Sequence, residues 1–305
     1  MNNGLKYHGA VVPLVTPFTP AGALDTGALN RLLDAQIAGG VEGIFVLGTT
    51  GEGAFVPREI RRQLVEQTVR RANRRAKIFV GLGDIRRSDV AEANDFFHAG
   101  ADAVVGHPPI AEKIPGEHLQ GWYQSLLDSL EGPLLIYNMP MTTGVSVPLD
   151  AVEKLLGHPR LAGIKDSENN PARLEETMRR FGGKKDFAVF VGVGALMEKG
   201  LKLGADGIVP SVGNLIPDVC QKLCDAAQNG KWNDAKTFSS RMSDVAAVYQ
   251  KGRKLNESLA ALKAAVSCRG LCAPAVLPPL LALPQTEVEK IRGVMEQLHL
   301  LNGIL

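Results

Sequence analysis

The sequence predicts an α/β protein, a (β/α)8 TIM barrel with a C-terminal helical extension. From about residue 9 to about residue 230, eight short β-rich runs alternate with amphipathic segments of helical spacing. The runs are continuously apolar, as a parallel sheet covered on both faces requires. Eight such units in this length fit a closed barrel. The β-rich runs then stop, so we expect a barrel domain over residues 1–230 and a helical region over residues 231–305.

The individual elements follow from the same pattern. The predicted strands are residues 9–18, 43–50, 77–83, 101–109, 133–140, 161–167, 187–194 and 206–213. Residues 26–40 typify the helices between them, since leucines recur at helical spacing and Gly39-Gly40 ends the segment. Residues 233–250, 256–270 and 286–301 indicate the later helices. A doubly wound open sheet is the alternative, but the first strand ends in TPFTPAG instead of a Gly-rich phosphate loop.

The composition argues against several kinds of partner. The 305 residues carry a formal net charge of +2, and basic pairs such as Arg61-Arg62 and Arg74-Arg75 are balanced by acids elsewhere. A nucleic-acid partner is therefore not expected. No apolar run approaches the roughly 20 residues that span a bilayer, and MNNGLKYHGA lacks the apolar segment of a secretion signal. We expect a cytoplasmic protein that does not contact membranes.

The four cysteines fall in two pairs at i,i+4 spacing, Cys220/Cys224 and Cys268/Cys272, within segments predicted as helices. Neither pair has a Cys-x-x-Cys knuckle or a nearby His-x-x-x-His. We interpret them as small apolar helix positions and expect no metal site.

A lysine lies inside the apolar run LAGIKDSEN, where most chains avoid a charge. Burying an ammonium costs several kcal/mol unless it is paired or neutralised. Strand alternation puts Leu161, Gly163 and Lys165 on one side, so Lys165 can point into the barrel while Ile164 packs outward. A deprotonated lysine is a nucleophile. The alternative interpretation is a lysine whose stem is buried and whose head reaches water.

Other polar residues follow neighbouring strands, at the end of a barrel where chemistry is found. The second strand ends in GTTGE, residues 48–52, and the fifth in YNMP, residues 137–140. Each has an ordinary interpretation, as a Gly-rich turn or a rim tyrosine. Together with Lys165, the Tyr137 phenol and the paired hydroxyls of Thr49 and Thr50 supply an amine, a proton shuttle and a carboxylate binder. These are the parts that imine chemistry needs.

At this point the sequence resembles a known family. GTTGE, YNMP and GIKDS, in this order on strands two, five and six, are similar to motifs of the class I pyruvate-dependent lyases of the dihydrodipicolinate synthase and N-acetylneuraminate lyase family. The resemblance extends to GADGIVPSVGNLIP on strand eight and to the helical tail, and so covers nearly the whole chain.

The resemblance implies a role for each site residue. Lys165 would form a Schiff base with the ketone of pyruvate or another 2-keto acid, and Tyr137, with Thr50, would move protons. Thr49 and Thr50 would hold the keto-acid carboxylate. It implies no cofactor, because the protonated imine is the electron sink.

The resemblance also implies two backbone contacts and an assembly. Gly192 and Val209 match positions whose backbone carbonyls line the site in the family. A homotetramer built as a dimer of dimers would be the assembly.

The site departs from the pattern of the synthase branch in the acceptor region. Thr142 stands where that branch carries an arginine that grips the carboxylate of the aldehyde substrate, and a hydroxyl cannot make this bidentate pair. Thr142 is therefore assigned to substrate binding. Strand seven, GVGAL, also lacks the acidic residue that many relatives have there. These features favour a polyhydroxylated acceptor, as in aldolases of 2-keto-3-deoxy sugar acids.

A second departure concerns proton transfer. Most members have two tyrosines after the Pro-Pro of strand four, and one of them reaches the site of the neighbouring subunit. This chain has Ile110 and Ala111 there. Three interpretations stay open: Tyr137 with Thr50 and water suffices, His107 replaces the tyrosine, or the enzyme is weak or repurposed.

The leading hypothesis is a Schiff-base lyase that splits a 2-keto-3-deoxy sugar acid, or a similar 2-keto acid, into pyruvate and an aldehyde. Dihydrodipicolinate synthase-like condensation, N-acetylneuraminate lyase, hydroxy-oxoglutarate aldolase and keto-deoxy acid dehydratase activities are the alternatives within this chemistry. Outside it, the chain would be a catalytically weak keto-acid-binding barrel, or a phosphosugar enzyme with a cradle at Gly192 and Gly213.

Overall fold

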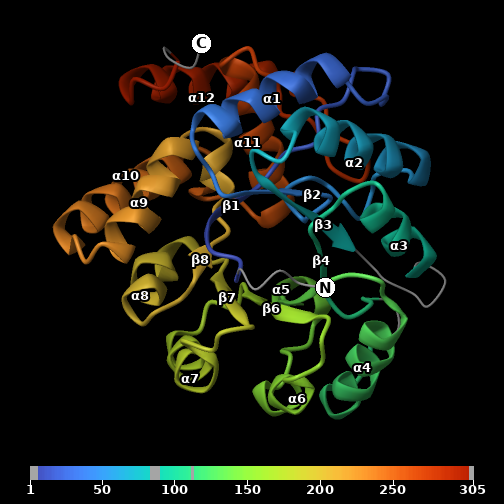
Figure 1. The fold of residues 1–305 in the computed structure, drawn as a ribbon. Coiled ribbons are helices and arrows are strands. Elements are labelled where there is room, and N and C mark those ends of the chain that lie inside the picture. The colour runs from blue at the N-terminus through green and yellow to red at the C-terminus, as the bar shows by residue number, and fades with distance from the viewer. Residues whose placement is uncertain (1–5, 83–89, 111–112, 302–305) are drawn as a thin grey trace.

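Eight parallel strands close into a barrel, which confirms the predicted fold. The computed structural model describes residues 6–82, 90–110 and 113–301. The strands pair in chain order, and β8 pairs with β1 to close the sheet (Figure 1). The strands are β1 Gly9–Pro13, β2 Gly43–Val46, β3 Lys77–Leu82, β4 Ala103–Gly106, β5 Leu134–Asn138, β6 Leu161–Asp166, β7 Ala188–Val191 and β8 Gly207–Ile208.

Helices surround the strands and cover their outer faces (Figure 1). They are α1 Thr26–Ala38, α2 Arg58–Ala72, α3 Val90–His98, α4 Leu119–Ser129, α5 Pro140–Thr143, α6 Leu149–Leu155, α7 Pro171–Phe181, α8 Met197–Lys202, α9 Pro217–Gln228, α10 Trp232–Gln250, α11 Leu255–Cys268 and α12 Gln285–Gln297. Short 3-10 turns among the described residues are η2 Gly116–His118, η3 Gly194–Leu196 and η4 Ser211–Asn214.

The barrel interior is filled by a few large rings opposite glycines. Phe79 and Phe190 are buried inside, with ring centroids 6.3 Å apart. A Cβ at Gly207 would lie 2.5 Å from the Phe190 ring and 2.2 Å from the Gly9 carbonyl oxygen, and a Cβ at Gly43 would lie 2.8 Å from the Phe79 ring. Glycine at these positions therefore gives the rings the space they occupy.

The prediction for one side chain of β6 was wrong. The pairing of β5 with β6 shifts register, since Leu134 pairs with Leu161 but Leu135 pairs with Gly163. The shift leaves one extra residue in β6, and such a residue interrupts the strict alternation of side chains between the two faces of the sheet. Leu161 therefore joins Ile164 in the outer core, and Ala162 lies in the inner one. Beyond the irregularity the alternation resumes.

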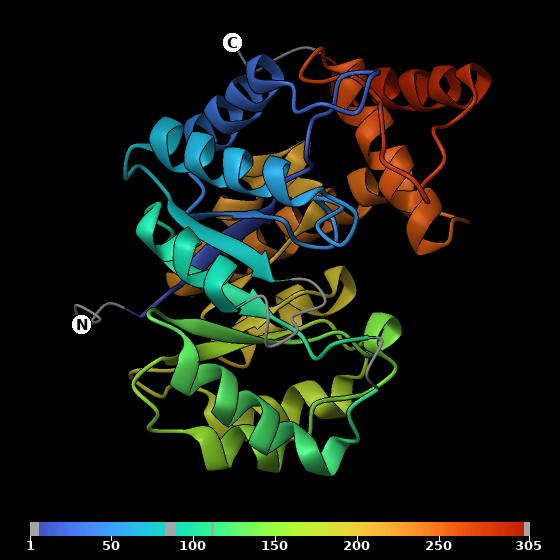
Figure 2. The same cartoon turned by 90° about the vertical axis from the view of Figure 1, so that its right-hand side faces the viewer.

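The helical segment after residue 230 packs directly on the barrel. Helix α10 packs along α9, and α11 packs along α10. Residues of α10, α11 and α12 belong to the same hydrophobic core as the residues around the outer face of the strands. Figure 2 shows α11 and α12 on the side toward which the strands point. The division of the chain into a barrel domain over residues 1–230 and a helical region over residues 231–305 stays a prediction.

All four cysteines lie in the described residues, are buried and form no disulfide. The helical assignment was wrong for Cys272, which follows the end of α11 at Cys268. Within the described residues, no helix combines the length and the apolar character needed to cross a membrane.

The crowding at Gly207 predicts a strong effect of one methyl group. Gly207→Ala would press a Cβ against the Gly9 carbonyl where β8 meets β1. We expect a loss of about 2–3 kcal/mol or more in the free energy of unfolding, because a backbone atom cannot yield without opening the barrel. Gly121→Ala in α4 is the matched control, since a Cβ there meets nothing within 4 Å. That variant should be stabilised by about 0.5–1 kcal/mol. Urea unfolding of both measures the difference, and equal stabilities would contradict the packing argument.

Candidate active site

The pairing of β5 with β6 brings the two central residues of the site together. Tyr137 is the register partner of Lys165, and Asn138 is the partner of Asp166. Both strands end within a residue of these positions. The side chains therefore stand at the carboxyl end of the barrel, where loops leave room for a ligand.

Lys165 is buried among aromatic rings. Its side chain points into the barrel as the sequence predicts, and the residue is only 6% exposed. The Lys165 Nζ atom lies 3.7 Å from the centre of the Tyr137 ring and 5.0 Å from the centre of the Phe45 ring. The ring faces offset part of the cost of burying an ammonium. No acidic side chain forms an ion pair with Lys165 among the described residues.

The environment of Tyr137 lowers the pKa of its phenol. Burial alone raises the pKa of the phenol, but the positive charge of Lys165 outweighs it with the help of hydrogen bonds from Thr49, Lys165 and Ser167. The net pKa of Tyr137 lies below its ordinary value. The phenol and the amine therefore form a coupled pair between which a proton can move.

The hydroxyl beside the phenol comes from Thr49. Thr49 Oγ1 lies 3.4 Å from Tyr137 Oη. The sequence prediction paired Thr50 with Tyr137, and the structure puts Thr49 in this place. Thr50 is the next residue of the same loop and is half-buried. Its part in carboxylate binding stays a prediction.

A polar network behind the site ties the ends of β5 and β6 together. Asn138 Nδ2 donates to Asp166 Oδ1 at 2.9 Å. Arg173 of α7 donates from Nε to Asp166 Oδ2 at 2.7 Å and from Nη2 to the Val147 carbonyl at 2.8 Å. These groups are buried or nearly so, and each of these hydrogen bonds involves a charged side chain, either Asp166 or Arg173. The network fixes the residues that follow Tyr137 and Lys165, and with them the spacing of the phenol and the amine.

A cavity of about 170 Å³ opens above the phenol. Tyr137, Thr49 and Thr142 line it, and Leu255 and Leu259 of α11 close another side. Thr142 Oγ1 is buried and has no hydrogen-bond partner among the described residues. An unsatisfied buried hydroxyl costs free energy unless a ligand or water meets it. No lysine or arginine lines the cavity within the part of the chain that the structure describes.

Ile110, Ala111 and His107 are the residues that bear on the missing tyrosine pair. Ile110 lines the cavity and offers no proton. Ala111 lies outside the described residues. His107 is buried with its ring 5.9 Å from that of Tyr137, edge to face, and its Nδ1 lies 2.7 Å from the Pro108 carbonyl oxygen. His107 is thus the imidazole nearest the phenol in the described cavity.

Gly192 and Val209 follow β7 and β8 at the same end of the barrel. A Cβ at Gly192 would lie 2.1 Å from Ser167 Oγ. Glycine is therefore required if the Ser167 hydroxyl is to stand beside Tyr137. Val209 is buried in the inner core with Tyr137. Their carbonyl contacts to a ligand stay predictions.

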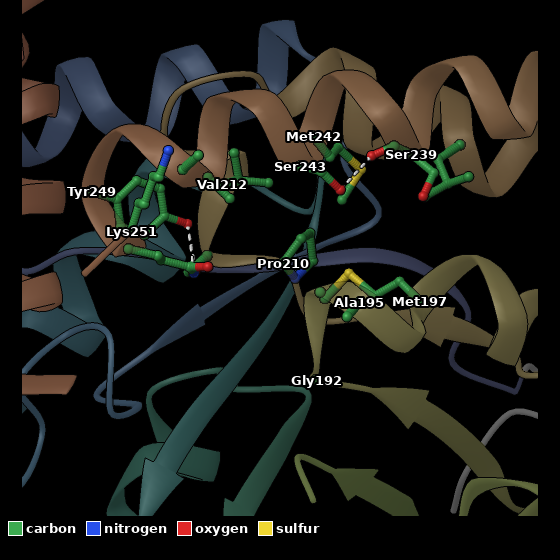
Figure 3. Close-up of a pocket in the computed structure, with 16 residues that line it drawn as sticks. Gly192, Ala195, Met197, Pro210, Val212, Ser239, Met242, Ser243, Tyr249 and Lys251 are labelled. Atoms are coloured by element: carbon green, nitrogen blue, oxygen red, sulfur yellow. Dashed lines mark hydrogen bonds between the residues drawn. The ribbon is translucent and has the colours of Figure 1, made fainter. Parts of the chain in front are cut away.

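A second cavity, of about 370 Å³, lies between α10 and the turns after β7 and β8 (Figure 3). Gly192 lies at one side of it and Tyr249 at the other. The Tyr249 hydroxyl is already paired with Ser211 at 2.8 Å, and burial raises its pKa. The Tyr249 and Ser211 hydroxyls are thus satisfied within the protein.

Sequence reasoning missed several contributors. Ser167 stands in the quoted motif GIKDS but gave no separate signal. Leu255, Asn256 and Leu259 belong to α11 and reach the cavity only through the fold. Among the described residues, no group of three or more His, Cys, Asp or Glu side chains gathers as a metal site would need.

The four tyrosines of the chain predict a selective titration. Burial raises the pKa of Tyr7, Tyr123 and Tyr249 above the ordinary value of about 10, whereas that of Tyr137 is lowered. We expect one tyrosinate to appear in the ultraviolet spectrum below pH 10 while the protein is folded. Tyr137→Phe should abolish this step, and Lys165→Met should move it to higher pH because the ammonium is gone. A low-pH step that survives Tyr137→Phe would contradict the assignment.

The comparisons with known proteins agree with this geometry. Residues 6–298 match the model of the Dihydrodipicolinate synthetase family. A 4-hydroxy-tetrahydrodipicolinate synthase of Sulfurihydrogenibium sp. is 29% identical over 294 residues, which are 95% of this chain and 98% of that protein.

Solved structures show the same likeness. Dihydrodipicolinate synthase from Bacteroides thetaiotaomicron is 32% identical with a TM-score of 0.90, covering 95% of this chain and 98% of that one. YagE of E. coli K12, described as a family member in complex with pyruvate, is 27% identical with a TM-score of 0.89, covering 96% and 99%. The chain thus belongs to the Dihydrodipicolinate synthetase family, whose members are class I lyases of the pyruvate-dependent aldolase type.

Proposed function

We propose that this lyase is a Schiff-base aldolase that cleaves a 2-keto-3-deoxy sugar acid into pyruvate and an aldehyde. The observation that carries the proposal is the neutral, unpartnered Thr142 hydroxyl in a cavity without a described lysine or arginine. Such a wall suits a hydroxylated acceptor, because a second carboxylate would be desolvated there without a cation.

Lys165 is the proposed nucleophile. Its amine would add to the C2 ketone of the keto acid, and loss of water from the resulting carbinolamine would give a protonated imine. The Tyr137 phenolate would take the proton of the C4 hydroxyl as the C3–C4 bond breaks, which leaves the electron pair of that bond in the imine as an enamine and releases the aldehyde. Protonation at C3 and hydrolysis would return pyruvate and the free amine.

Tyr137 is the proposed proton shuttle. Its phenol lies against the Lys165 ammonium and has a lowered pKa, which supports proton exchange between the two. Thr49 and Ser167 orient the phenol through their hydroxyls. His107 is the group best placed to relay the proton onward in the absence of a second tyrosine, since its ring lies edge to face with that of Tyr137.

The loop that carries Thr49 and Thr50 is the proposed binder of the keto-acid carboxylate. The Thr49 hydroxyl of this loop lies 3.4 Å from Tyr137 Oη, and Thr49 lines the cavity. Neutral donors of this kind hold a carboxylate without a counter-charge.

Condensation of pyruvate with aspartate semialdehyde is the main alternative, because relatives carry the name 4-hydroxy-tetrahydrodipicolinate synthase. The absence of an arginine at position 142 weighs against it. N-acetylneuraminate lyase, hydroxy-oxoglutarate aldolase and dehydratase activities share the imine and differ in the acceptor. A homotetrameric assembly and a cytoplasmic location stay predictions.

Borohydride trapping tests the nucleophile. We expect pyruvate with borohydride to label Lys165 irreversibly, because reduction of the imine gives a stable secondary amine. Lys165→Met should abolish labelling while the protein still unfolds at a similar temperature, since an apolar chain of like length fits between the Phe45 and Tyr137 rings. Peptide mass spectrometry locates the label. A label on another lysine, or none on the folded protein, would remove the mechanism and favour a keto-acid-binding barrel.

A comparison of acceptors tests the substrate class. Glyceraldehyde should condense with pyruvate better than aspartate semialdehyde does, by about 1.5–3 kcal/mol, or one to two decades in kcat/KM, because one bidentate charge pair is lacking. Thr142→Arg should shift the preference toward aspartate semialdehyde by about tenfold. Met141→Arg is the matched control, since Met141 is 75% exposed on the same helix. Efficient use of aspartate semialdehyde by the unmodified protein would overturn the substrate assignment.

A further inference from the structure

A buried ion pair links the active-site loop to helix α11. Glu52, the last residue of GTTGE, and Lys263 of α11 are each only 1% exposed at the side chain, and Lys263 Nζ donates to Glu52 Oε1. The two residues lie 211 positions apart in the chain. Burial lowers the pKa of the Lys263 ammonium, although the Glu52 carboxylate opposes this. A charge pair in such a place is costly to maintain.

Further contacts satisfy both charges. Glu52 Oε2 accepts from the Leu277 backbone N–H at 2.8 Å, and Lys263 Nζ donates to the Ala275 carbonyl at 2.8 Å. Lys263 Nζ also lies 4.6 Å from the centre of the Phe18 ring. The pair therefore joins the loop after β2, helix α11 and the chain that follows this helix.

The loop itself is tightly confined. Leu47 and Glu52 both have positive φ, 57° and 59°, which is unusual for residues with a Cβ. A Cβ at Gly53 would lie 1.9 Å from the Leu47 carbonyl oxygen. Thr49 lies within this turn, since the Glu52 N–H donates to the Thr49 carbonyl at 3.1 Å. A displacement of Glu52 would therefore be passed to the Thr49 hydroxyl.

We propose that Glu52 and Lys263 form a positioning pair, through which helix α11 holds the Thr49-Thr50 loop in the geometry that binds the keto-acid carboxylate. This inference rests on the proposed function. Two buried charges are a poor means of stabilising a fold, because apolar residues of similar volume commonly serve as well. The pair instead gives the strained turn one orientation relative to Tyr137, and α11 brings Leu255 and Leu259 to the same cavity. Lys263 does not line the cavity, and Glu52, which does, has both carboxylate oxygens engaged within the protein.

The experiment separates positioning from stability. The probe is pyruvate with borohydride, and mass spectrometry gives the fraction of Lys165 labelled at each pyruvate concentration. Lys263→Met and Glu52→Gln should raise the half-saturating pyruvate concentration about tenfold while the labelled fraction at saturation stays near that of the unmodified protein. Each single variant should also melt at a lower temperature, since a buried charge loses its partner.

The double variant Glu52→Gln/Lys263→Met provides the decisive comparison. It is also used in place of Lys263→Met if that single variant does not fold. Without buried charges the double variant should regain most of the melting temperature, yet keep the raised half-saturating concentration because the link from α11 to the loop is missing. A purely structural pair would restore both together, and this result would overturn the inference.

Lys6→Met is the matched control. It removes the ion pair of Lys6 with Asp206, whose side chains are 20% and 15% exposed respectively. This ion pair lies near the starts of β1 and β8, at the end of the barrel opposite the active site. The control variant should lower the melting temperature without changing the pyruvate dependence. Absence of a label on Lys165 in the unmodified protein overturns the proposed function and the inference with it. A normal label with unchanged half-saturation in all variants overturns the inference alone.

Discussion

The burial of Lys165 at the end of β6 is the constraint around which the site is arranged. An amine placed in the barrel mouth without an acidic partner among the described residues needs other compensation, and the rings of Tyr137 and Phe45 provide part of it. The same proximity lowers the pKa of the Tyr137 phenol. One placement thus sets a buried amine against a phenol of increased acidity, which is the pairing that imine chemistry requires.

That placement depends on groups that never reach the cavity. The register of β5 against β6 sets Tyr137 opposite Lys165, and the bonds from Asn138 and Arg173 to Asp166 keep the two strand ends from separating. Gly192 leaves room for the Ser167 hydroxyl on the third side. The rigid part of the site is therefore built from strand ends, where backbone pairing limits motion.

The sequence predicts the barrel and the central residues because both produce local patterns in the order of apolar and polar residues. Continuous apolar runs mark the strands, and a lysine within such a run is visible at once. What it could not predict depends on departures from regular geometry. The shifted register of β6 moved Leu161 outward, and the Thr49 hydroxyl lies beside the phenol in a loop where Leu47 and Glu52 have positive φ. Lys263 lies in an amphipathic helix, where a lysine ordinarily faces water, and only the fold reveals its burial.

The site has two walls of different origin. In the proposed function the keto-acid end would meet strand ends and the Thr49-Thr50 loop, whereas the acceptor end would meet Thr142 of α5, Ile110, and the first turns of α11. The first wall is fixed by backbone pairing and a buried ion pair, so its chemistry tolerates little change. The second is made of side chains on short or peripheral elements, where a single substitution alters charge without disturbing the amine. This division would let a site keep its imine chemistry with Thr142 and Ile110 at positions where the family resemblance leads us to expect an arginine and a tyrosine.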